Sequence, residues 1–312
     1  MTNLAYNLKN FVTMKDYRKT ALNPYQQIEL LKSQGLVISD SKRVKRHLSN
    51  VNYYRISAYM LPYKLILPDG RRVDHFYPGV SWDDVYDLYK FDRKLRLLVF
   101  DAIERIEVAL RAQLIYQLSQ KYGGYWLNDR TIFKPTYNQR TGKEYSIFDD
   151  INSRIAIAPC WESIESLYFS ELSRICFSLK SKQDVKDLAS YFGVHNEEVF
   201  CSWLHSINYV RNVCAHHGRL WNINLAIQPA KYKNPKSGKV WLDKHEMQIV
   251  DRAKMYYFMC VLLYLLQTVN PGTKYRERFM NLLQDYPNVN IALMGFEIGW
   301  ESHPLWKKNY KL

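Results

Sequence analysis

The chain has 312 residues, of which 47% are hydrophobic, and its mean hydropathy is −0.38. These values exclude an intrinsically disordered chain and predict a folded protein with a sizeable core, arranged as one large or two modest domains. The formal net charge of +14 suggests an anionic partner, and nucleic acid is the obvious one, although basic proteins are common and charge alone decides little.

Nothing in the sequence predicts export or membrane insertion. The N-terminus lacks the charged start and apolar run of a signal peptide. The longest apolar run, residues 256–266, is too short against the roughly 20 residues that span a bilayer, and it predicts a buried core helix. The five cysteines are an odd number without a C-x-x-C pair, which favours a reducing compartment and argues against structural zinc. We therefore expect a cytoplasmic protein without a membrane partner, metal or cofactor.

The first 80 residues form a basic region. Residues 1–75 hold 13 Lys and Arg against five Asp and Glu, an excess of eight positive charges. A helix is predicted from Pro24 to Leu31, and the capping signal Ser39-Asp-Ser before Lys42 predicts a second helix that reaches toward Tyr54. The Asp69-Gly70 pair between apolar flanks predicts the turn of a β-hairpin.

This helix, helix, hairpin order suits a winged helix-turn-helix that binds RNA or DNA phosphates. Its candidate phosphate contacts are Lys42, Arg43, Lys45 and Arg46 on the second helix and Arg71 and Arg72 on the wing. The alternative is a solvated, charged face of an accessory subdomain. Tyr53, Tyr54 and Tyr59 offer either rings for unpaired bases or simple packing.

A long helix is predicted from Trp82 to Tyr122, opened by a cap at Ser81 and ended by Gly123-Gly124. Arg105 and Arg111 on this helix are candidates for surface or dimer-interface ion pairs, or for phosphate contacts. Residues 124–149, rich in Gly, Pro, Asn and Thr, predict a loop insertion.

Further helices are predicted at residues 161–179, 183–191, 200–214 and 244–266, followed by a tail at 269–312 with one helix near 275–283, docked on the body. The basic stretch 229–239 lies close in sequence to the helix of residues 200–214. Its Lys231 and Lys233 are candidates for RNA phosphates, with a solvated loop as the alternative.

Imidazoles, guanidiniums and amides concentrate in residues 201–222, on an apolar helical background. Gly218 is the predicted helix stop. Asn212 and His216 are four residues apart, so their side chains share one face of the helix. Arg211 and His216 point roughly 140° apart on an ideal helix, so a shared ligand or a second chain has to bring their tips together.

Arg and His suit phosphodiester chemistry. A guanidinium is a permanently charged fork for phosphate oxygens, and an imidazole takes and returns a proton near neutral pH. RNA cleavage by its own 2′-OH needs these two roles and requires no metal. The structural alternative is a histidine cap on the helix C-terminus and an ordinary ion pair for Arg211.

The sequence resembles a known family at several places. Arg211-Asn-Val-Cys-Ala-His216 has the R-x4-H form of the HEPN superfamily, and residues 203–222 resemble the signature of the Abi-like (AbiD/AbiF) abortive-infection proteins. Three other segments look like the same family's pattern: Asn52–Tyr59, Leu88–Leu98 with Asp101–Arg111, and Pro159-Cys-Trp-Glu162.

The resemblance implies a mainly α fold. It has a HEPN-like helical bundle at 81–268, preceded by the basic region 1–80 and followed by the tail. It further implies a phage-defence effector, of the kind found in toxin–antitoxin systems, that is a metal-independent endoribonuclease acting on RNA. Its homodimer would place two R-x4-H motifs face to face.

In this hypothesis His216 is the general acid or base, Arg211 stabilises the phosphate, and Asn212 orients the imidazole. His217 and Arg219 are further candidates. One alternative is a non-catalytic RNA-binding module that holds a regulatory non-coding RNA, and another is a purely structural interaction protein.

Overall fold

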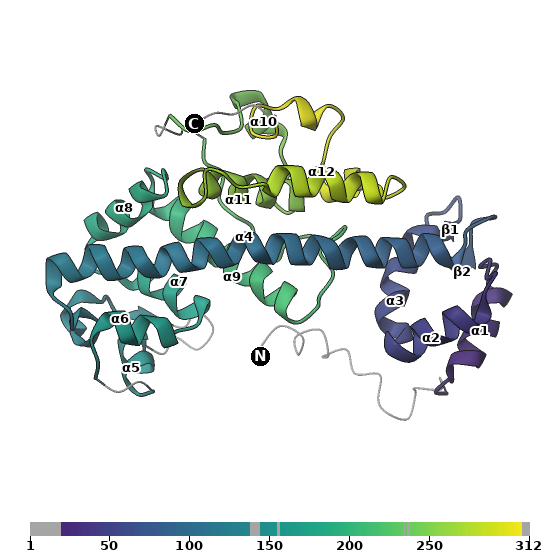
Figure 1. The fold of residues 1–312 in the computed structure, drawn as a ribbon, viewed down its shortest axis with the longest axis horizontal. Helices are drawn as coiled ribbons and strands as arrows, with labels where there is room; N and C mark the ends of the chain where they lie inside the picture. Colours follow the sequence, from purple (N-terminus) through teal and green to yellow (C-terminus); the bar gives the residue numbers. More distant parts are fainter. Residues whose placement is uncertain (1–19, 138–143, 155–156, 234, 236–237, 308–312) are drawn as a thin grey trace. The chain divides into compact units, whose positions relative to one another are not determined.

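The structure is a computed structural model that describes residues 20–137, 144–154, 157–233, 235 and 238–307 (Figure 1). The fold is mainly α-helical, which confirms the fold class predicted from the sequence. The chain divides into two compact units, here called unit 1 (residues 1–89) and unit 2 (residues 90–312). The division falls inside one long helix, between residues 89 and 90.

Unit 1 begins with three short helices and a hairpin: α1 Pro24–Ser33, α2 Ser41–Asn50, α3 Tyr53–Met60, the 3-10 turn Leu61–Tyr63, β1 Lys64–Ile66 and β2 Arg72–Phe76. The predicted first helix is confirmed. The predicted second helix is too long, because it ends at Asn50 instead of reaching Tyr54. There Val51 is extended, and the Asn52 side chain accepts a hydrogen bond from the Tyr54 N–H, which caps a new helix.

The hairpin of unit 1 closes against the connection between α1 and α2. Strands β1 and β2 are antiparallel, with Lys64 opposite Phe76, and Gly70 takes a φ of +82° in the turn between them. Val37 forms a parallel bridge to Ser81, and the Phe76 N–H donates to the Gln34 carbonyl over 2.8 Å. Helix, bridge, helix, helix and hairpin follow one another, which is the element order of a winged helix.

Helix α4 spans Trp82–Tyr122, as predicted, and runs through the boundary between the units as one helix. Its start is a reciprocal cap. The Asp84 carboxylate accepts hydrogen bonds from the Ser81 N–H and hydroxyl, at 2.8 and 2.6 Å, and the Ser81 hydroxyl accepts from the Asp84 N–H at 3.3 Å.

Unit 2 is built around the remainder of α4. Figure 1 shows α11 and α12 along one side of this helix and α7 and α9 along the other. Besides α4, its elements are the 3-10 turns Trp126–Asn128, Arg130–Ile132, Ile164–Ser166, Ile291–Met294 and Trp300–Ser302, the short strands β3 Thr136–Tyr137 and β4 Glu144–Tyr145, and the helices α5 Ile147–Asn152, α6 Cys160–Ser163, α7 Phe169–Ser178, α8 Lys182–Tyr191, α9 Glu197–Ala215, α10 Lys244–Ile249, α11 Met255–Val269 and α12 Tyr275–Asp285.

Helix α11 is the core of unit 2. Every residue from Met255 to Leu266 is buried, so the prediction of a core helix is confirmed. The predicted single helix 244–266 is wrong, because residues 250–254 separate α10 from α11. The Asp251 carboxylate accepts a hydrogen bond from the Ala253 N–H, 2.9 Å away, and this local turn competes with the helix. In the described part of the chain, no helix is both long enough and apolar enough to span a membrane.

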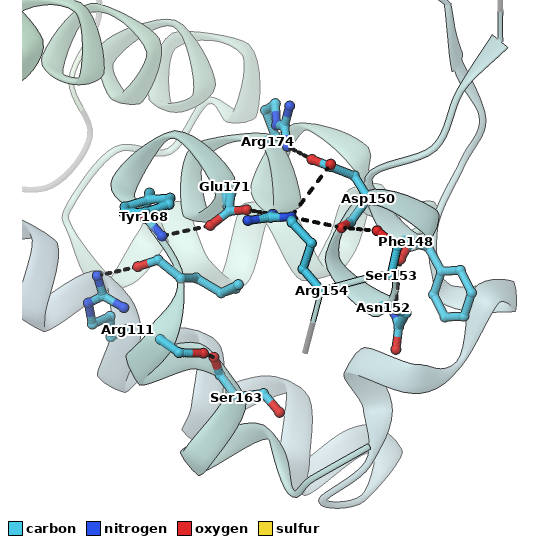
Figure 2. A network of polar contacts seen from close by, with 12 residues as sticks. Arg111, Phe148, Asp150, Asn152, Ser153, Arg154, Ser163, Tyr168, Glu171 and Arg174 are labelled. Atoms are coloured by element: carbon cyan, nitrogen blue, oxygen red, sulfur yellow. Dashed lines mark hydrogen bonds and ion pairs between the residues drawn. The ribbon is translucent and has the colours of Figure 1, made fainter. Parts of the chain in front are cut away.

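The predicted helix 161–179 is also divided, into α6, a 3-10 turn and α7. Arg111 on α4 explains the division. Its guanidinium donates to the carbonyl oxygens of Ile164 and Leu167 and pairs with Glu107, which ends the 3-10 turn there. Glu171 then caps α7 by accepting a hydrogen bond from the Tyr168 N–H over 2.7 Å (Figure 2). Arg111 therefore holds backbone carbonyls.

Residues 124–149 do not form the plain loop that their composition predicts. Their described part contains 3-10 turns and short strands, and Trp126, Leu127, Ile132, Phe133 and Ile147 are buried. Figure 2 shows the polar network that fixes α5 to α7 just beyond this segment, in which Asp150 pairs with Arg174 and Arg154 with Glu171. Residues 138–143, the centre of the predicted insertion, lie outside the described residues.

The end of the described chain packs through aromatic side chains. Phe279 of α12, Phe296, Trp300 and Trp306 form one cluster, with the rings of Phe296 and Trp300 centred 4.8 Å apart. Tyr256 of α11 contacts Phe296 at 4.9 Å between ring centroids. Residues beyond α12 thus belong to the core of unit 2.

Candidate active site at the end of helix α9

Helix α9 carries the R-x4-H sequence and extends the predicted helix by three residues at its start. Asn196 caps it by accepting a hydrogen bond from the Val199 N–H over 2.9 Å. One face is buried in unit 2, with Trp203, Ile207 and Val210 wholly covered. His205, Asn212 and His216 are exposed on the opposite face, so the amphipathic spacing of the sequence predicts the orientation of this helix correctly.

The C-terminus of α9 ends differently from the prediction. His216 is the capping residue, and His217, not Gly218, takes the left-handed conformation, with a φ of +58°. The His217 N–H donates to the Cys214 carbonyl over 3.0 Å and the Gly218 N–H to the Val213 carbonyl over 2.7 Å. These two bonds define a Schellman motif with a histidine where glycine is usual.

Gly218 is required here for a different reason. A Cβ atom on Gly218 would lie 2.9 Å from Cγ1 of Val213 and 3.1 Å from the Val213 carbonyl oxygen. Any side chain would therefore push the loop away from the last turn of α9. The glycine makes close approach possible, and the strained backbone falls on the preceding histidine.

Asp92 on α4 holds the loop that follows. Its side chain is fully buried, and Oδ1 accepts hydrogen bonds from the backbone N–H groups of Leu220 and Trp221, at 3.0 and 2.6 Å. Its other oxygen pairs with the buried Arg96, one helical turn later, and Arg96 also donates to the Gly218 carbonyl over 3.1 Å. The pair thus anchors the backbone just after His216 and His217.

Sequence reasoning gave Asp92 and Arg96 no role. Both lie in the segment Leu88–Leu98 that resembles the family pattern, but the hydrogen bonds of Asp92 join residues 128 and 129 positions apart. One signal was available. Asp92 keeps helical spacing with the apolar Leu88, Leu95 and Val99, and a carboxylate on a buried stripe needs partners.

Arg211 lies against α4. Its guanidinium carbon is 5.8 Å from the ring centroid of Phe100, and its Nε atom is buried and has no hydrogen-bond partner among the described residues. The side chain is half-buried, whereas His216 is exposed. Within the described residues Arg211 makes no hydrogen bond to His216, in keeping with the wide angle between them on the helix.

Asn212 and His216 share the exposed face, as predicted, and the bond between them is from the His216 N–H to the Asn212 carbonyl, over 3.0 Å. In the described structure their side chains do not hydrogen bond to each other. His217 is exposed and Arg219 is half-buried, and both lie in the segment that Asp92 and Arg96 hold.

The thiols near the motif are not poised as nucleophiles. Burial raises the pKa of Cys214 to about 12 and that of Cys201 to about 11. Both therefore stay protonated at neutral pH, and a thiolate is the reactive form. The imidazole and guanidinium groups remain the reactive candidates of this helix.

The basic stretch after the motif is largely committed to packing. The Lys231 ammonium donates to the carbonyls of Met247 and Gln248, at 2.7 and 3.2 Å, and so caps the end of α10. Trp203 and Tyr257 both donate to the Ala230 carbonyl. We therefore leave Lys231 out of the RNA surface predicted from the sequence, while Lys233 is exposed.

Among the candidate RNA-binding cations of unit 1, some contact other side chains and others are exposed. Arg43 pairs with both oxygens of Asp83, at 2.6 and 2.7 Å, and Arg71 pairs with Asp69. Lys45 lies over the ring of Tyr25, whereas Lys42, Arg46 and Arg72 are exposed.

A family model described as Abi-like protein matches residues 46–222 of this chain. The match covers more than half of the sequence and contains Asp92, Arg96, all of α9 and the anchored loop. The chain belongs to the Abi-like protein family. Membership suggests that this Abi-like protein acts in abortive infection, a defence against phage. No curated protein and no solved structure was found to match it.

Proposed function

We propose that this Abi-like protein is an endoribonuclease of the HEPN type that cuts RNA during phage defence. The observation that carries the proposal is the backbone around His216. The exposed imidazole belongs to the capping residue of the Schellman motif, and the loop that follows is anchored by the buried Asp92–Arg96 pair. Such support holds a reactive side chain in place, as a catalytic site requires.

In the proposed reaction, an imidazole removes the proton of a ribose 2′-OH, and the 2′ oxygen attacks the adjacent phosphorus. The bond from phosphorus to the 5′ oxygen breaks, and a second imidazole returns a proton to that oxygen. The products are a 2′,3′-cyclic phosphate and a 5′-OH. Arg211 stabilises the negative charge that develops on the phosphate oxygens.

The proposal includes a homodimer, because Arg211 and His216 of a single chain point in different directions. Arg211 lies against Phe100 while His216 is exposed to solvent. A second copy that packs its own α9 against this face would provide the second imidazole and bring His216 of one chain to Arg211 of the other. The Asn212 amide, on the same exposed face, is then placed to orient an imidazole by turning its side chain.

The test is to express wild type, Arg211→Ala, His216→Ala and His245→Ala, and to sequence the RNA ends that appear in the cell. His245 is the matched control, since it is an exposed histidine on a different helix, α10, away from the face of α9 that the second copy would cover. Wild type and His245→Ala should give the same new ends, which carry cyclic phosphates. His216→Ala should lower cleavage by about 10²- to 10⁴-fold, the usual contribution of general acid–base catalysis. Equal cleavage by His216→Ala would refute the proposed site.

The separation of Arg211 and His216 within one chain favours a second candidate function, a non-catalytic module that holds a regulatory RNA. In that case a defined, intact RNA should co-purify equally with wild type and His216→Ala. No cleavage ends should then depend on either residue.

A further inference from the structure

We propose that unit 1 is a separate binding surface for single-stranded RNA, formed by the outward faces of α2 and α3. The choice of RNA rests on the proposed function, while the surface itself is argued from unit 1 alone. Its parts are the cations Lys42, Lys45 and Arg46 and the ring of Tyr54, and they are called the α2–α3 surface below.

In unit 1, some cations pair with acidic residues and others face solvent. Among its described residues, Glu29, Asp69, Asp74 and Asp83 are each paired with a cation, which cancels much of the charge. Lys42 and Arg46 are exposed and have no acidic partner in the described structure. Val44 and Leu48 are buried on the same helix. Positions 42 and 46 therefore point away from the core, one helical turn apart, as positively charged groups facing solvent.

Lys45 lies beside this pair and is held in place. Its ammonium group is 4.0 Å from the ring centroid of Tyr25 and 2.6 Å from the Tyr25 hydroxyl, and neither contact neutralises its charge. The contact extends the basic face of α2 toward α1. Three cations on one helix face suit the regularly spaced phosphates of a nucleic-acid strand.

Of the three tyrosines near the end of α2, one presents its ring to solvent. Tyr59 is buried edge-on against Tyr89, and burial raises the pKa of the half-buried Tyr53. Tyr54 is 86% exposed and lies in the first turn of α3, four residues after the end of α2. Tyr54 closely follows the basic helix α2 in the sequence, and exposed aromatic rings combined with cations are how proteins hold unpaired bases.

These features favour a single strand over a duplex. The deep, narrow major groove of duplex RNA does not admit a side chain at the end of a helix, whereas an unpaired base stacks on a tyrosine ring. Tyr54 is exposed at the start of α3, and its ring is such a stacking group.

The experiment measures binding of a labelled single-stranded RNA and of its duplex to the full-length protein. His216→Ala is the background, so that cleavage does not interfere. Removing two phosphate contacts in Lys42→Ala/Arg46→Ala should lower the slope of log affinity against log salt by about 1.4 and weaken binding about 25-fold at 0.1 M salt. Tyr54→Ala should weaken single-strand binding about 5- to 150-fold at every salt concentration, while Tyr54→Phe keeps it.

Lys182→Ala/Lys186→Ala is the matched control. These are two exposed lysines one turn apart on α8, in unit 2, and their removal changes the net charge by the same amount. Similar losses in the control and in the α2 variant would overturn the α2–α3 surface, as would equal or tighter binding of the duplex. Circular dichroism should show that Tyr54→Ala and both double variants remain folded, since the substituted side chains are exposed.

The outcome is independent of the proposed catalysis. If the α2 and α3 variants lose single-stranded RNA while the wild type never cuts it, the binding surface stands and the nuclease fails. If cleavage depends on His216 but binding is indifferent to Lys42, Arg46 and Tyr54, the nuclease stands and this surface fails.

Discussion

His217 holds a backbone conformation that glycine usually holds. Its φ of +58° places a residue with a Cβ atom in the left-handed region, at a cost of about 1 to 2 kcal/mol. The neighbouring glycine does not relieve this strain, because it is needed for close approach to Val213. Backbone strain of this kind is concentrated at functional sites, and His217 lies directly beside His216, the proposed general acid or base.

We therefore predict that His217→Gly increases the free energy of unfolding by about 0.5 to 1 kcal/mol, after the larger unfolded-state entropy of glycine is subtracted. Urea denaturation of both proteins measures it. His216→Gly is the control, since His216 has an ordinary φ of −90° and should lose stability with the same exchange. A loss in His217→Gly would mean that the side-chain interactions of His217 outweigh its backbone strain.

Lys239 should make the stability of the protein depend on pH. Burial lowers the pKa of this half-buried lysine to about 8, and its ammonium donates to the Phe192 carbonyl over 3.2 Å. An unfolded lysine has a pKa of about 10.4, so between these values the unfolded chain binds a proton that the folded chain does not. Stability contributed by this site therefore rises with pH in that window.

The prediction is a comparison with Lys239→Met. Between pH 7 and about 9.5, the free energy of unfolding of the wild type should rise relative to that of the variant, as measured by denaturant titration at each pH. Lys233→Met replaces an exposed lysine nearby and should show a constant difference from the wild type. A constant difference for Lys239→Met as well would show that its ammonium stays charged in the folded protein.

At the scale of elements, one buried ion pair connects α4 to the loop that follows His217, here called the motif loop. Asp92 supplies the acceptors for Leu220 and Trp221, and Arg96 neutralises it. Removing one member of a buried pair leaves an uncompensated charge, which costs about 3 to 5 kcal/mol. Asp92 is thus a positioning residue for the loop after His216.

Asp92→Ala should therefore lower the free energy of unfolding by about 3 to 5 kcal/mol. Asp92→Asn retains an oxygen for the two N–H groups and should lose less stability, while thermal denaturation and circular dichroism show whether it stays folded. In the folded Asn variant, the pH profile of RNA cleavage should shift relative to the wild type if the loop positions His216. An unchanged profile with reduced stability would assign Asp92 a structural role alone.

The helices that the sequence predicts well are those with strong local signals. The Ser81–Asp84 cap and Gly123 mark the ends of α4, and apolar spacing marks α9 and α11. The sequence mislocates breaks that depend on distant partners. Arg111 divides α6 from α7 by binding carbonyls more than 50 residues away, and no local pattern predicts that.

In the candidate site too, the sequence predicts what depends on local spacing and misses what depends on distant residues. Spacing along one helix correctly places Asn212 and His216 on a common exposed face, and separates Arg211 from them. The support of the loop could not be predicted, because Asp92 and Arg96 come from α4. Lys231 looked like an RNA ligand since a basic stretch resembles an arm, but the end of α10 uses its charge.

At the scale of the whole chain, the two units carry different parts of the proposed function. Unit 2 contains α9 and its anchored loop, and unit 1 contains the α2–α3 surface. The match to the family begins at residue 46, inside α2, and ends at residue 222, after the motif loop, so it includes portions of both. The proposed binding and cleavage steps can therefore be tested by separate substitutions.

The hydrogen bonds that hold the motif loop also form late in protein synthesis, because their partners are far apart in the sequence. Asp92 leaves the ribosome long before Leu220, 128 residues later, which at about 5 to 20 residues per second is roughly 6 to 26 s. The Trp221 indole N–H donates a hydrogen bond of 3.1 Å to the Asn290 carbonyl, which is synthesised 69 residues later. A nascent chain therefore completes the contacts that hold this loop only after Asn290 has left the ribosome.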